Sequence, residues 1–392
     1  MQQDRGSNQA GMRAYNERLV LSLVRRHGGL AKADIARSTG LSAQTVSVIM
    51  RGLEEEGLLV RGEPVKGRVG QPSVPMHLAP DGAFSIGLKI GRRSADLALV
   101  DFLGEVRLQL HVVYPYPTPE PIIAFVEDGI GELLGALPKT KRKRLAGLGV
   151  AYPFELWNWS EEVGAPRDKM ELWREFDLAE ALGTCTDLPI FVQNDATAAC
   201  GAELIVGEGS AYIDFVYLFV GSFVGGGVVL NNSVYAGRSG NAGAFGSMPI
   251  PTEYGRAQQL IDEASIFVLE NQLRALGVDP SPLWLDPNDW SGFQGLIDPW
   301  IERTGESLAH AIVAACSVID FPAAIIDGGF PRDVRRSVVL ATRRAIEGLD
   351  LQGIETPDVL EGSVGANARV IGAAALPFFA RYLVNQNVLL KL

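Results

Sequence analysis

The sequence predicts an α/β protein with a small helical module in front of it. From residue 84 onward, strand-like runs alternate with helical stretches, and Gly-rich turns stand at the strand ends. Before that point, residues 1–80 hold eleven Lys/Arg and seven Asp/Glu, a net charge of +4, whereas the rest of the chain carries −15. A basic module on an acidic body indicates that the module alone meets a polyanion.

The composition is that of a globular protein with 392 residues, of which 47% are hydrophobic, enough for two or three domains. Its three cysteines, Cys185, Cys200 and Cys316, lie far apart, which favours buried thiols in a reducing cytoplasm over a disulfide frame or a zinc site. The longest uncharged segment, residues 215–237, is broken by glycines and an Asn pair, so it indicates a strand-turn-strand and no membrane helix. We therefore expect a cytoplasmic protein without a membrane span.

The first predicted element is a helix over residues 14–27. Leu19, Leu23 and Val24 fall on one of its faces. Its arginines outside that face are Arg18, Arg25 and Arg26. A Gly pair ends the helix, and a short second helix is expected around residues 32–38.

The next stretch, SAQTVSVIMRGLEEEG, predicts a capped amphipathic helix. Ser42 is placed to cap its first turn, and Gly57 is placed to end it. Its expected buried stripe consists of Val46, Ile49, Met50 and Leu53. Two helices joined by a tight turn that contains glycine, the second helix being capped and amphipathic, make a helix-turn-helix. The ribbon VRGEPVKGRVGQPSVPMHL that follows is typical of a β-wing.

The exposed side of the second helix would enter the major groove with its N-terminal residues at the base edges. Gln44 can pair bidentately with adenine, and Ser47 can donate or accept. The wing tip carries long polar side chains among Gly and Pro, which suits phosphates or a minor groove. The expected DNA contacts are Ser42, Ala43, Gln44, Thr45, Ser47 and Arg51 on the helix and Lys66, Arg68 and Gln71 on the wing. The alternative is a helical interaction module with ordinary surface arginines.

The body begins with a predicted β-meander over residues 84–114. Helical stretches and the strands LAGLGV, PIFVQ, FVYLFV and AAIID follow, and a helix closes the chain. This alternation places a ligand crevice outside the strand ends. The basic run KTKRKR, residues 139–144, favours a solvated linker, with a second nucleic-acid patch as the alternative. The expected domains are a winged helix-turn-helix DNA-binding domain, 1–80, and a ligand-sensing and dimerisation body, 81–392.

The order of motifs resembles the ROK family of sugar-responsive repressors and sugar kinases. The motifs that carry the resemblance are GLGVAYPF, APRDKMELW, VQNDATAACGAE, GSFVGGGVV, VYAGRSGNAGAFG, IIDGGF and VGANARVIGAA, behind a winged helix like that of the repressor branch. The resemblance implies an actin-like, two-lobed, ribonuclease H-like body. Its first lobe would span about 81–193 plus the C-terminal helix, and its second lobe about 194–374.

Departures from the family pattern argue against catalysis. Where the kinases have an acidic, Gly-rich phosphate loop, this chain has Lys89, Arg92 and Arg93. Where the second phosphate loop should be bare backbone, Phe223 places a phenyl ring. Phosphoryl transfer depends almost entirely on such positioning groups, so we expect no kinase activity, no catalytic residues and no cofactor.

The sugar side departs as well. The family's sugar-binding Glu and His correspond to Ala244 and Ser247, and the Cys-rich zinc run is missing from PTEYGRAQQLIDEAS, so no metal is expected. Asn194 and Asp195 stand at a strand-to-helix turn, where they can contact a ligand or merely cap the helix. The expected ligand-binding set is Asn194, Asp195, Ala244, Ser247 and Trp173.

These observations predict a DNA-binding transcriptional regulator of the repressor type. A catalytically degenerate body would sense a sugar or sugar derivative, and the partners would be a double-stranded DNA operator, the small effector, and a second or further copies of the chain in a homodimer or homotetramer. One alternative is a sugar kinase with a fused DNA-binding domain. A second alternative is a scaffold whose body binds no ligand and only dimerises.

Overall fold

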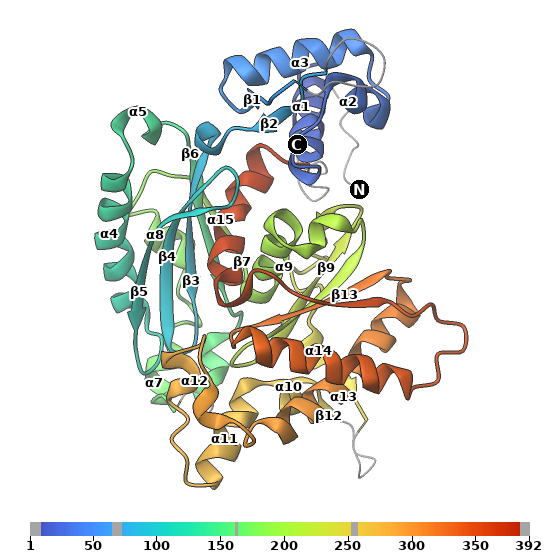
Figure 1. Ribbon diagram of the computed structural model, residues 1–392. Helices are drawn as coiled ribbons and strands as arrows, with labels where there is room; N and C mark the ends of the chain where they lie inside the picture. Colours follow the sequence, from blue (N-terminus) through green and yellow to red (C-terminus); the bar gives the residue numbers. More distant parts are fainter. Residues whose placement is uncertain (1–8, 65–72, 161–163, 252–257, 385–392) are drawn as a thin grey trace, which may run out of the picture.

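The computed structural model describes residues 9–64, 73–160, 164–251 and 258–384. Figure 1 shows a small N-terminal domain resting on one end of a larger body. The body has two lobes, which meet along helix α15 (Ala368–Arg381, red). Within the described part of the chain, no helix is long and apolar enough to cross a membrane.

The N-terminal domain has three helices and a two-stranded ribbon, the order of a winged helix. Its elements are α1 (Gln9–Arg26), α2 (Lys32–Thr39), α3 (Ala43–Glu55), β1 (Leu59–Arg61) and β2 (Met76–Leu78). The two strands pair antiparallel, with Leu59 opposite Leu78. The expected wing contacts Lys66, Arg68 and Gln71 lie outside the described residues.

The turn between α2 and α3 follows from a few residues. Gly40 ends α2 with a φ of 71°, a left-handed conformation that glycine adopts without steric strain. Ser42 then caps α3, because its hydroxyl accepts a hydrogen bond from the backbone N–H of Thr45 at 3.1 Å. The buried residues of α3 are those predicted: Val46, Ile49, Met50 and Leu53.

The buried face of α1 differs from the one expected. Val20, Leu21 and Val24 are buried, whereas Leu19 and Leu23 are only partly covered. The physical reason is that α1 has two packing partners, α3 and the wing on one side and the body on the other. A helical period taken alone assigns one apolar stripe and cannot show a second partner.

The body contains two five-stranded sheets with the same topology. In each, three antiparallel strands come first and two parallel strands follow on the other side, in the spatial orders β5-β4-β3-β6-β7 and β10-β9-β8-β13-β14. The first sheet consists of β3 (Phe84–Ile90), β4 (Ser94–Asp101), β5 (Val106–Val113), β6 (Leu145–Tyr152) and β7 (Ile190–Asn194). The second consists of β8 (Phe215–Val220), β9 (Val224–Leu230), β10 (Ser233–Val234), β13 (Ala323–Gly328) and β14 (Asp358–Glu361).

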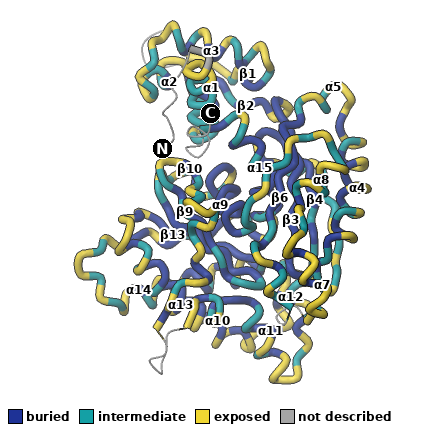
Figure 2. Tube along the Cα trace, turned by 180° about the vertical axis from the view of Figure 1, so that it is seen from behind, coloured by how far each residue is buried: buried dark blue, intermediate teal, exposed yellow. Residues whose placement is uncertain are grey.

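Helices cover these sheets, and a short β11–β12 ribbon joins the second lobe. Figure 2 shows that the strands are largely buried, while exposed stretches gather on the outer helices and on α3. The remaining elements are α4 (Pro119–Ala136), α5 (Lys139–Arg142), α7 (Arg167–Glu171), α8 (Leu178–Leu182), α9 (Asp195–Val206), β11 (Pro249–Ile250), β12 (Gln258–Gln259), α10 (Ile261–Ala264), α11 (Ile266–Ala275), α12 (Pro282–Leu285), α13 (Asp298–Val318) and α14 (Arg332–Glu347).

Helices α9 and α15 pack against each other between the two sheets (Figure 1). Glycines permit their close approach. A Cβ on Gly149 of β6 would lie 1.7 Å from the carbonyl oxygen of Ala373, and one on Gly372 would lie 1.9 Å from that of Ala198. This packing brings the first turns of α9 and α15 together at the mouth of the cleft between the lobes.

The N-terminal domain is docked on both lobes through α1. Arg25 donates to the carbonyl oxygen of Phe102 in the first lobe, and its guanidinium lies 5.3 Å from the Phe102 ring centre. Its neighbour Arg26 donates to the side-chain oxygen of Asn232 in the second lobe at 2.8 Å. Buried apolar residues run without interruption from α1 into the body. The N-terminal domain is therefore packed against the body and is not joined to it by a flexible tether alone.

The basic run at residues 139–144 also takes part in this docking. Lys141 pairs with Asp81 at 2.6 Å, and Arg144 donates to the carbonyl oxygens of Gly57 and Gly82 at 3.3 and 3.0 Å. Of these contacts, the one from Arg144 to Gly57 reaches the N-terminal domain just after α3, while Asp81 and Gly82 belong to the start of the body. Arg144 thus adds a contact between the two domains, a role that the charge pattern of the run did not indicate.

Candidate functional site

A cleft of about 470 Å³ opens between the two lobes. The N-terminal end of α9 forms one wall, and the β8–β9 turn and the Gly-rich loop after β10 form another. Four of the five residues expected to bind a ligand line it: Asn194, Asp195, Ala244 and Ser247. Aromatic rings of Phe154, Trp159 and Phe223 add apolar faces on which a sugar ring can stack.

Asn194 and Asp195 support the start of α9. The Asn194 side chain accepts hydrogen bonds from the backbone N–H groups of Ala196 and Thr197, at 3.0 and 3.3 Å. One Asp195 oxygen accepts from Ala196, and the other pairs with Arg369 at 3.4 Å. Both side chains therefore cap α9, and both residues also line the wall of the cleft.

Ala244 and Ser247 are exposed at the cleft on the short turn that precedes β11. The loop is held close to β9 by Gly243, which has a φ of 79° and on which a Cβ would lie 2.6 Å from the Gly227 Cα. Polar groups near them complete the rim, namely Ser222, Ser239 and Asn241. Sequence reasoning missed these three, although they stand in the Gly-rich segments that it had singled out.

Trp173 is not brought to the cleft. Its ring is only 4% exposed, lies in the core of the first lobe and stacks near Tyr152. The indole N–H donates to the carbonyl oxygen of Pro117 at 3.1 Å, so its one polar group is already bonded. Trp173 therefore supports the first lobe and leaves the candidate ligand set.

Glu155 is a cleft residue that the sequence did not reveal. It is one of the described non-glycine residues with a left-handed backbone, at φ 59° and ψ 38°, and its carboxylate accepts from Asn158 at 3.0 Å. Such strained positions gather at functional sites. Only the three-dimensional structure shows this feature.

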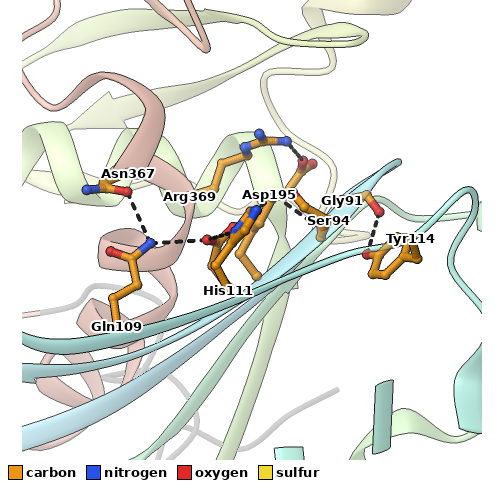
Figure 3. A network of polar contacts seen from close by, with 10 residues as sticks. Gly91, Ser94, Gln109, His111, Tyr114, Asp195, Asn367 and Arg369 are labelled. Atoms are coloured by element: carbon orange, nitrogen blue, oxygen red, sulfur yellow. Dashed lines mark hydrogen bonds and ion pairs between the residues drawn. The ribbon is translucent and has the colours of Figure 1, made fainter. Parts of the chain in front are cut away.

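A second compartment of about 460 Å³ adjoins the first and shares Arg92, Ser222 and Arg369 with it. Lys89 lies in its wall and donates to the Ser94 hydroxyl at 2.8 Å and to Asp96 at 3.1 Å. Burial lowers the pKa of Lys89 to about 8. Figure 3 shows this corner, where Arg369 reaches Asp195 and the Gln109 side chain reaches Asn367.

An ion pair and a cation–π contact join the two lobes across the second compartment. Arg92 of the first lobe pairs with Glu270 of the second at 2.8 Å, and both side chains are at most 3% exposed. Burial lowers the pKa of Arg92 to about 10. Arg93 lies 4.2 Å from the Trp284 ring centre, a cation–π contact. The two arginines that stand in the expected phosphate loop thus join the lobes.

Phe223 bridges the lobes inside the first compartment. Its ring centre lies 4.6 Å from that of Trp159 in the first lobe, in an edge-on contact, and 5.7 Å from that of Phe267 in the second lobe. The β8–β9 turn thus carries an aromatic ring that packs against both lobes. In the described part of the chain, no group of three or more His, Cys, Asp or Glu could hold a metal ion.

The helix residues expected to contact DNA lie on the outer side of α3. Ser42, Ala43, Gln44 and Arg51 are exposed, and Thr45 and Ser47 are partly so. Thr45 is held by its hydroxyl, which lies 2.8 Å from that of Ser42. Val48, which sequence reasoning passed over, is 57% exposed on the same side and offers an apolar group for a thymine methyl.

Comparison with known proteins agrees with this arrangement. Residues 85–261 match the model of the ROK family, and residues 15–68 match that of the MarR family. Two crystal structures share the fold. A ROK family transcriptional regulator, a homologue of the Escherichia coli MLC protein, has a TM-score of 0.64 at 20% identity and covers 93% of this chain and 96% of its own. A ROK glucokinase from Streptomyces griseus with glucose and AMPPNP has a TM-score of 0.57 at 21% identity and covers 75% and 99%.

Three curated relatives extend the comparison. An uncharacterized protein, y4fQ of Sinorhizobium fredii, is 26% identical over 374 residues, which is 94% of this chain and 92% of that protein. The xylose repressor of Bacillus spizizenii is 25% identical over 244 residues, 62% of each chain. The DNA-binding transcriptional dual regulator NagC of Escherichia coli is 23% identical over 240 residues, 61% of this chain and 58% of its own. The match to the two regulators thus spans less than two thirds of their length.

Proposed function

We propose that this chain, whose residues 85–261 match the model of the ROK family and whose residues 15–68 match that of the MarR family, is a DNA-binding repressor controlled by a sugar or a sugar derivative. The relatives named as xylose repressor and NagC support this reading. The observation that carries it furthest is the docking of α1, whose neighbouring arginines Arg25 and Arg26 bond to different lobes. A change in the angle between the lobes must therefore move the helix that carries the DNA-binding domain.

The operator would be read by α3. On the side away from the buried stripe, its first two turns present Gln44 and Ser47 at the N-terminal end that enters a major groove, and Arg51 follows one turn later. The wing residues Lys66 and Arg68 would contribute contacts to the DNA backbone.

The effector would occupy the first compartment. Asn194, Asp195 and Ser247 offer donors and acceptors on opposite walls, and Phe154 and Trp159 offer faces for an apolar side of a sugar ring. Because the walls belong to both lobes, a bound ligand favours one angle between the lobes over another. That differential affinity is what control of DNA binding requires.

The proposed activity is regulatory and not catalytic. The catalytic role of a carboxylate like Asp195 needs a phosphoryl donor placed beside it. Here Asp195 is paired with Arg369, and the β8–β9 turn carries Phe223, whose ring packs on Trp159. The likeness to ROK kinases is a likeness of fold. Purified protein should therefore produce no ADP from ATP with any member of a sugar panel. Turnover that disappears in Asp195→Asn would support the kinase alternative.

DNA binding is tested by a genomic binding screen followed by fluorescence anisotropy on the enriched site. We expect one enriched sequence class. Gln44→Ala should weaken binding about tenfold or more, since a good bidentate base contact contributes about 1–3 kcal/mol. Glu55→Ala, at the exposed far end of the same helix, is the matched control and should bind as the wild type does. The proposal fails if no sequence is enriched, or if the two variants behave alike.

The proposed assembly is a homodimer or homotetramer held by the body. One winged helix reads only a short half-site, and a two-fold protein matches a two-fold operator. Light scattering should give more than one chain per particle for the full chain and for residues 81–392. Monomers of both at micromolar concentration would contradict this proposal and leave the DNA-binding result untouched.

A further inference from the structure

A third cavity, of about 260 Å³, lies where α1 of the N-terminal domain rests on the body. In Figure 1, α1 stands above α9 and α15, and residues at the C-terminal ends of these two helices line the cavity. The β9–β10 turn, with Asn231 and Asn232, lines a further side. No lining residue is shared with either compartment between the lobes, so this cavity is separate from the cleft described above.

The walls of this cavity are mainly apolar. Helix α1 contributes Leu19 and Leu23, which are only partly covered. The body contributes side chains that are at most 9% exposed, namely Leu204, Ile205, Phe379 and Leu383. Apolar surface that is withdrawn from water stabilises a complex, so these walls favour a ligand with a hydrocarbon part. The volume is below the range of about 300–1,000 Å³ that is usual for drug-sized ligands, so the ligand must be small.

Among the described residues, two cations and no carboxylate line the cavity. Arg25 donates to the carbonyl oxygen of Phe102, and Arg26 donates to the amide oxygen of Asn232 at 2.8 Å. Both acceptors are neutral, and neither arginine makes an ion pair with any described residue. Two guanidinium charges without a contacting carboxylate favour an anionic group of a ligand.

The charge of Arg25 is partly withdrawn from water. Burial lowers the pKa of Arg25 to about 10, because the charged guanidinium is less well hydrated there. Asp101, the carboxylate that acts on it from a distance, pairs with Arg107 at 2.7 Å. Buried charges in proteins are normally paired, so an anion bound beside Arg25 would offset this loss of hydration.

We infer that this cavity binds a small apolar carboxylate, such as a medium-chain fatty acid or an arylacetic acid. The planar fork of a guanidinium matches the two oxygens of a carboxylate. The hydrocarbon part fits between the leucines of α1 and the apolar ends of α9 and α15.

Such a site would give the DNA-binding domain an effector of its own. Arg25 and Arg26 bond α1 to the first and the second lobe, and they would also hold the carboxylate. A ligand that takes donors from Arg26 competes with Asn232 and changes how α1 is docked. The inference goes beyond the proposed function, since both the ligand and its site differ from the sugar and the cleft.

The test is calorimetric titration of the full chain without DNA. The probes are octanoate, phenylacetate, octanol and acetate. Octanoate or phenylacetate should bind. Octanol should bind at least about tenfold more weakly than octanoate, because it cannot form the charge-assisted hydrogen bond, and acetate should bind weakest, because it lacks the hydrocarbon part.

Two variants separate the charged part of the site from the apolar part. Arg26→Gln should weaken octanoate binding about tenfold or more and leave octanol binding unchanged. Leu19→Gln should weaken the binding of both. Arg18→Gln is the matched control, because it removes the same charge from the same helix outside the cavity and should bind octanoate as the wild type does. Thermal melts confirm that each variant is folded.

The order of the two carboxylates identifies the ligand more closely. Tighter binding of octanoate assigns a flexible aliphatic chain to the cavity, and tighter binding of phenylacetate assigns an aromatic acid; either order supports the inference. It is overturned if wild-type protein binds neither carboxylate, if octanol binds as tightly as octanoate, or if Arg18→Gln weakens binding as much as Arg26→Gln does. Octanoate binding that appears only after deletion of residues 385–392 would mean that the end of the chain occupies the cavity, and it would overturn the inference too. Because no DNA is present, each result leaves the operator-binding screen to decide the proposed function separately.

Discussion

Single residues in the cleft serve two purposes at once. Asn194 caps α9 and faces the cleft, and Asp195 bonds to the helix with one oxygen and to Arg369 with the other. Capping and ligand contact stood as alternatives in the sequence, and the structure makes the first a fact while it leaves room for the second. A cap uses only one side of the Asn194 side chain, so its free amide can still meet a ligand.

The capping role of Asn194 leads to a stability prediction. Asn194→Ala removes the acceptor of two backbone N–H groups at the start of α9, and the free energy of unfolding should fall by about 1 kcal/mol. Asn194→Asp keeps an acceptor at this position and should recover most of that loss. Denaturant unfolding of the three proteins measures the difference. Equal midpoints for Ala and wild type would show that the cap does not stabilise this helix.

What the sequence could foresee at this scale depended on how local the cause was. The stripe of α3 and its Ser42 cap were predicted, because a helical period and a first-turn hydrogen bond involve only near neighbours. Trp173 was expected to contact a ligand, yet its position depends on Pro117, which lies 56 residues away. A pattern of residues carries no information about such a partner.

At the scale of elements, helices α9 and α15 form the axis on which both lobes are built. Small residues face each other where they cross, and Gly149 of β6 lets α15 lie directly on the first sheet. This contact sets the position of Arg369 and hence its reach to Asp195. The order of strands and helices was readable from the sequence, but the approach distance was not, because it depends on glycines in different elements.

The close contact at Gly149 can be tested directly. In Gly149→Ala the new Cβ would meet the Ala373 carbonyl oxygen at 1.7 Å, so α15 must shift. We expect a loss of several kcal/mol, about 3 or more, as for other overpacked cores and strained sites. Gly131→Ala is the control, since this exposed glycine of α4 has nothing within 4 Å of an added Cβ, and alanine favours helix by about 1 kcal/mol. The melting temperature should therefore fall in Gly149→Ala and rise in Gly131→Ala. A shift of both in the same direction would contradict the packing argument.

At the scale of the whole molecule, the two sheets have one topology but belong to different lobes, and α1 rests on both. The contact with the second lobe is made by a tight turn. Asn231 and Asn232, which join β9 to β10, have φ of 52° and 58°, the left-handed pair of a tight hairpin turn that asparagine adopts readily. No repeat or motif in the sequence indicated that Arg26 reaches this turn, 206 residues away. Long-range docking of this kind is decided by the assembled fold.

This arrangement yields a prediction about communication between the ligand and DNA. The bond from Arg26 to Asn232 is a polar link from α1 to the second lobe, whereas Arg25 bonds to the first lobe. Arg26→Ala should leave the affinity for the ligand unchanged. The factor by which the bound sugar changes operator affinity should become roughly fivefold smaller, a loss of about 1 kcal/mol of coupling free energy. Anisotropy titrations of the operator, with and without the sugar that stabilises the protein most in a thermal-shift panel, measure this effect.

The partner variant makes the assignment specific. If Arg26 acts through Asn232, then Asn232→Ala should reduce the ligand effect by a similar factor, and the double variant should lose no more than either single variant. Additive losses would mean that the two side chains act through different partners, and full ligand control in both single variants would remove α1 as the link. A loss of operator affinity without any loss of ligand effect would mean that Arg26 orients the winged helix but does not report the angle between the lobes. The double-mutant cycle therefore separates a transmitting contact from a merely supporting one, which the position of Arg26 alone cannot do.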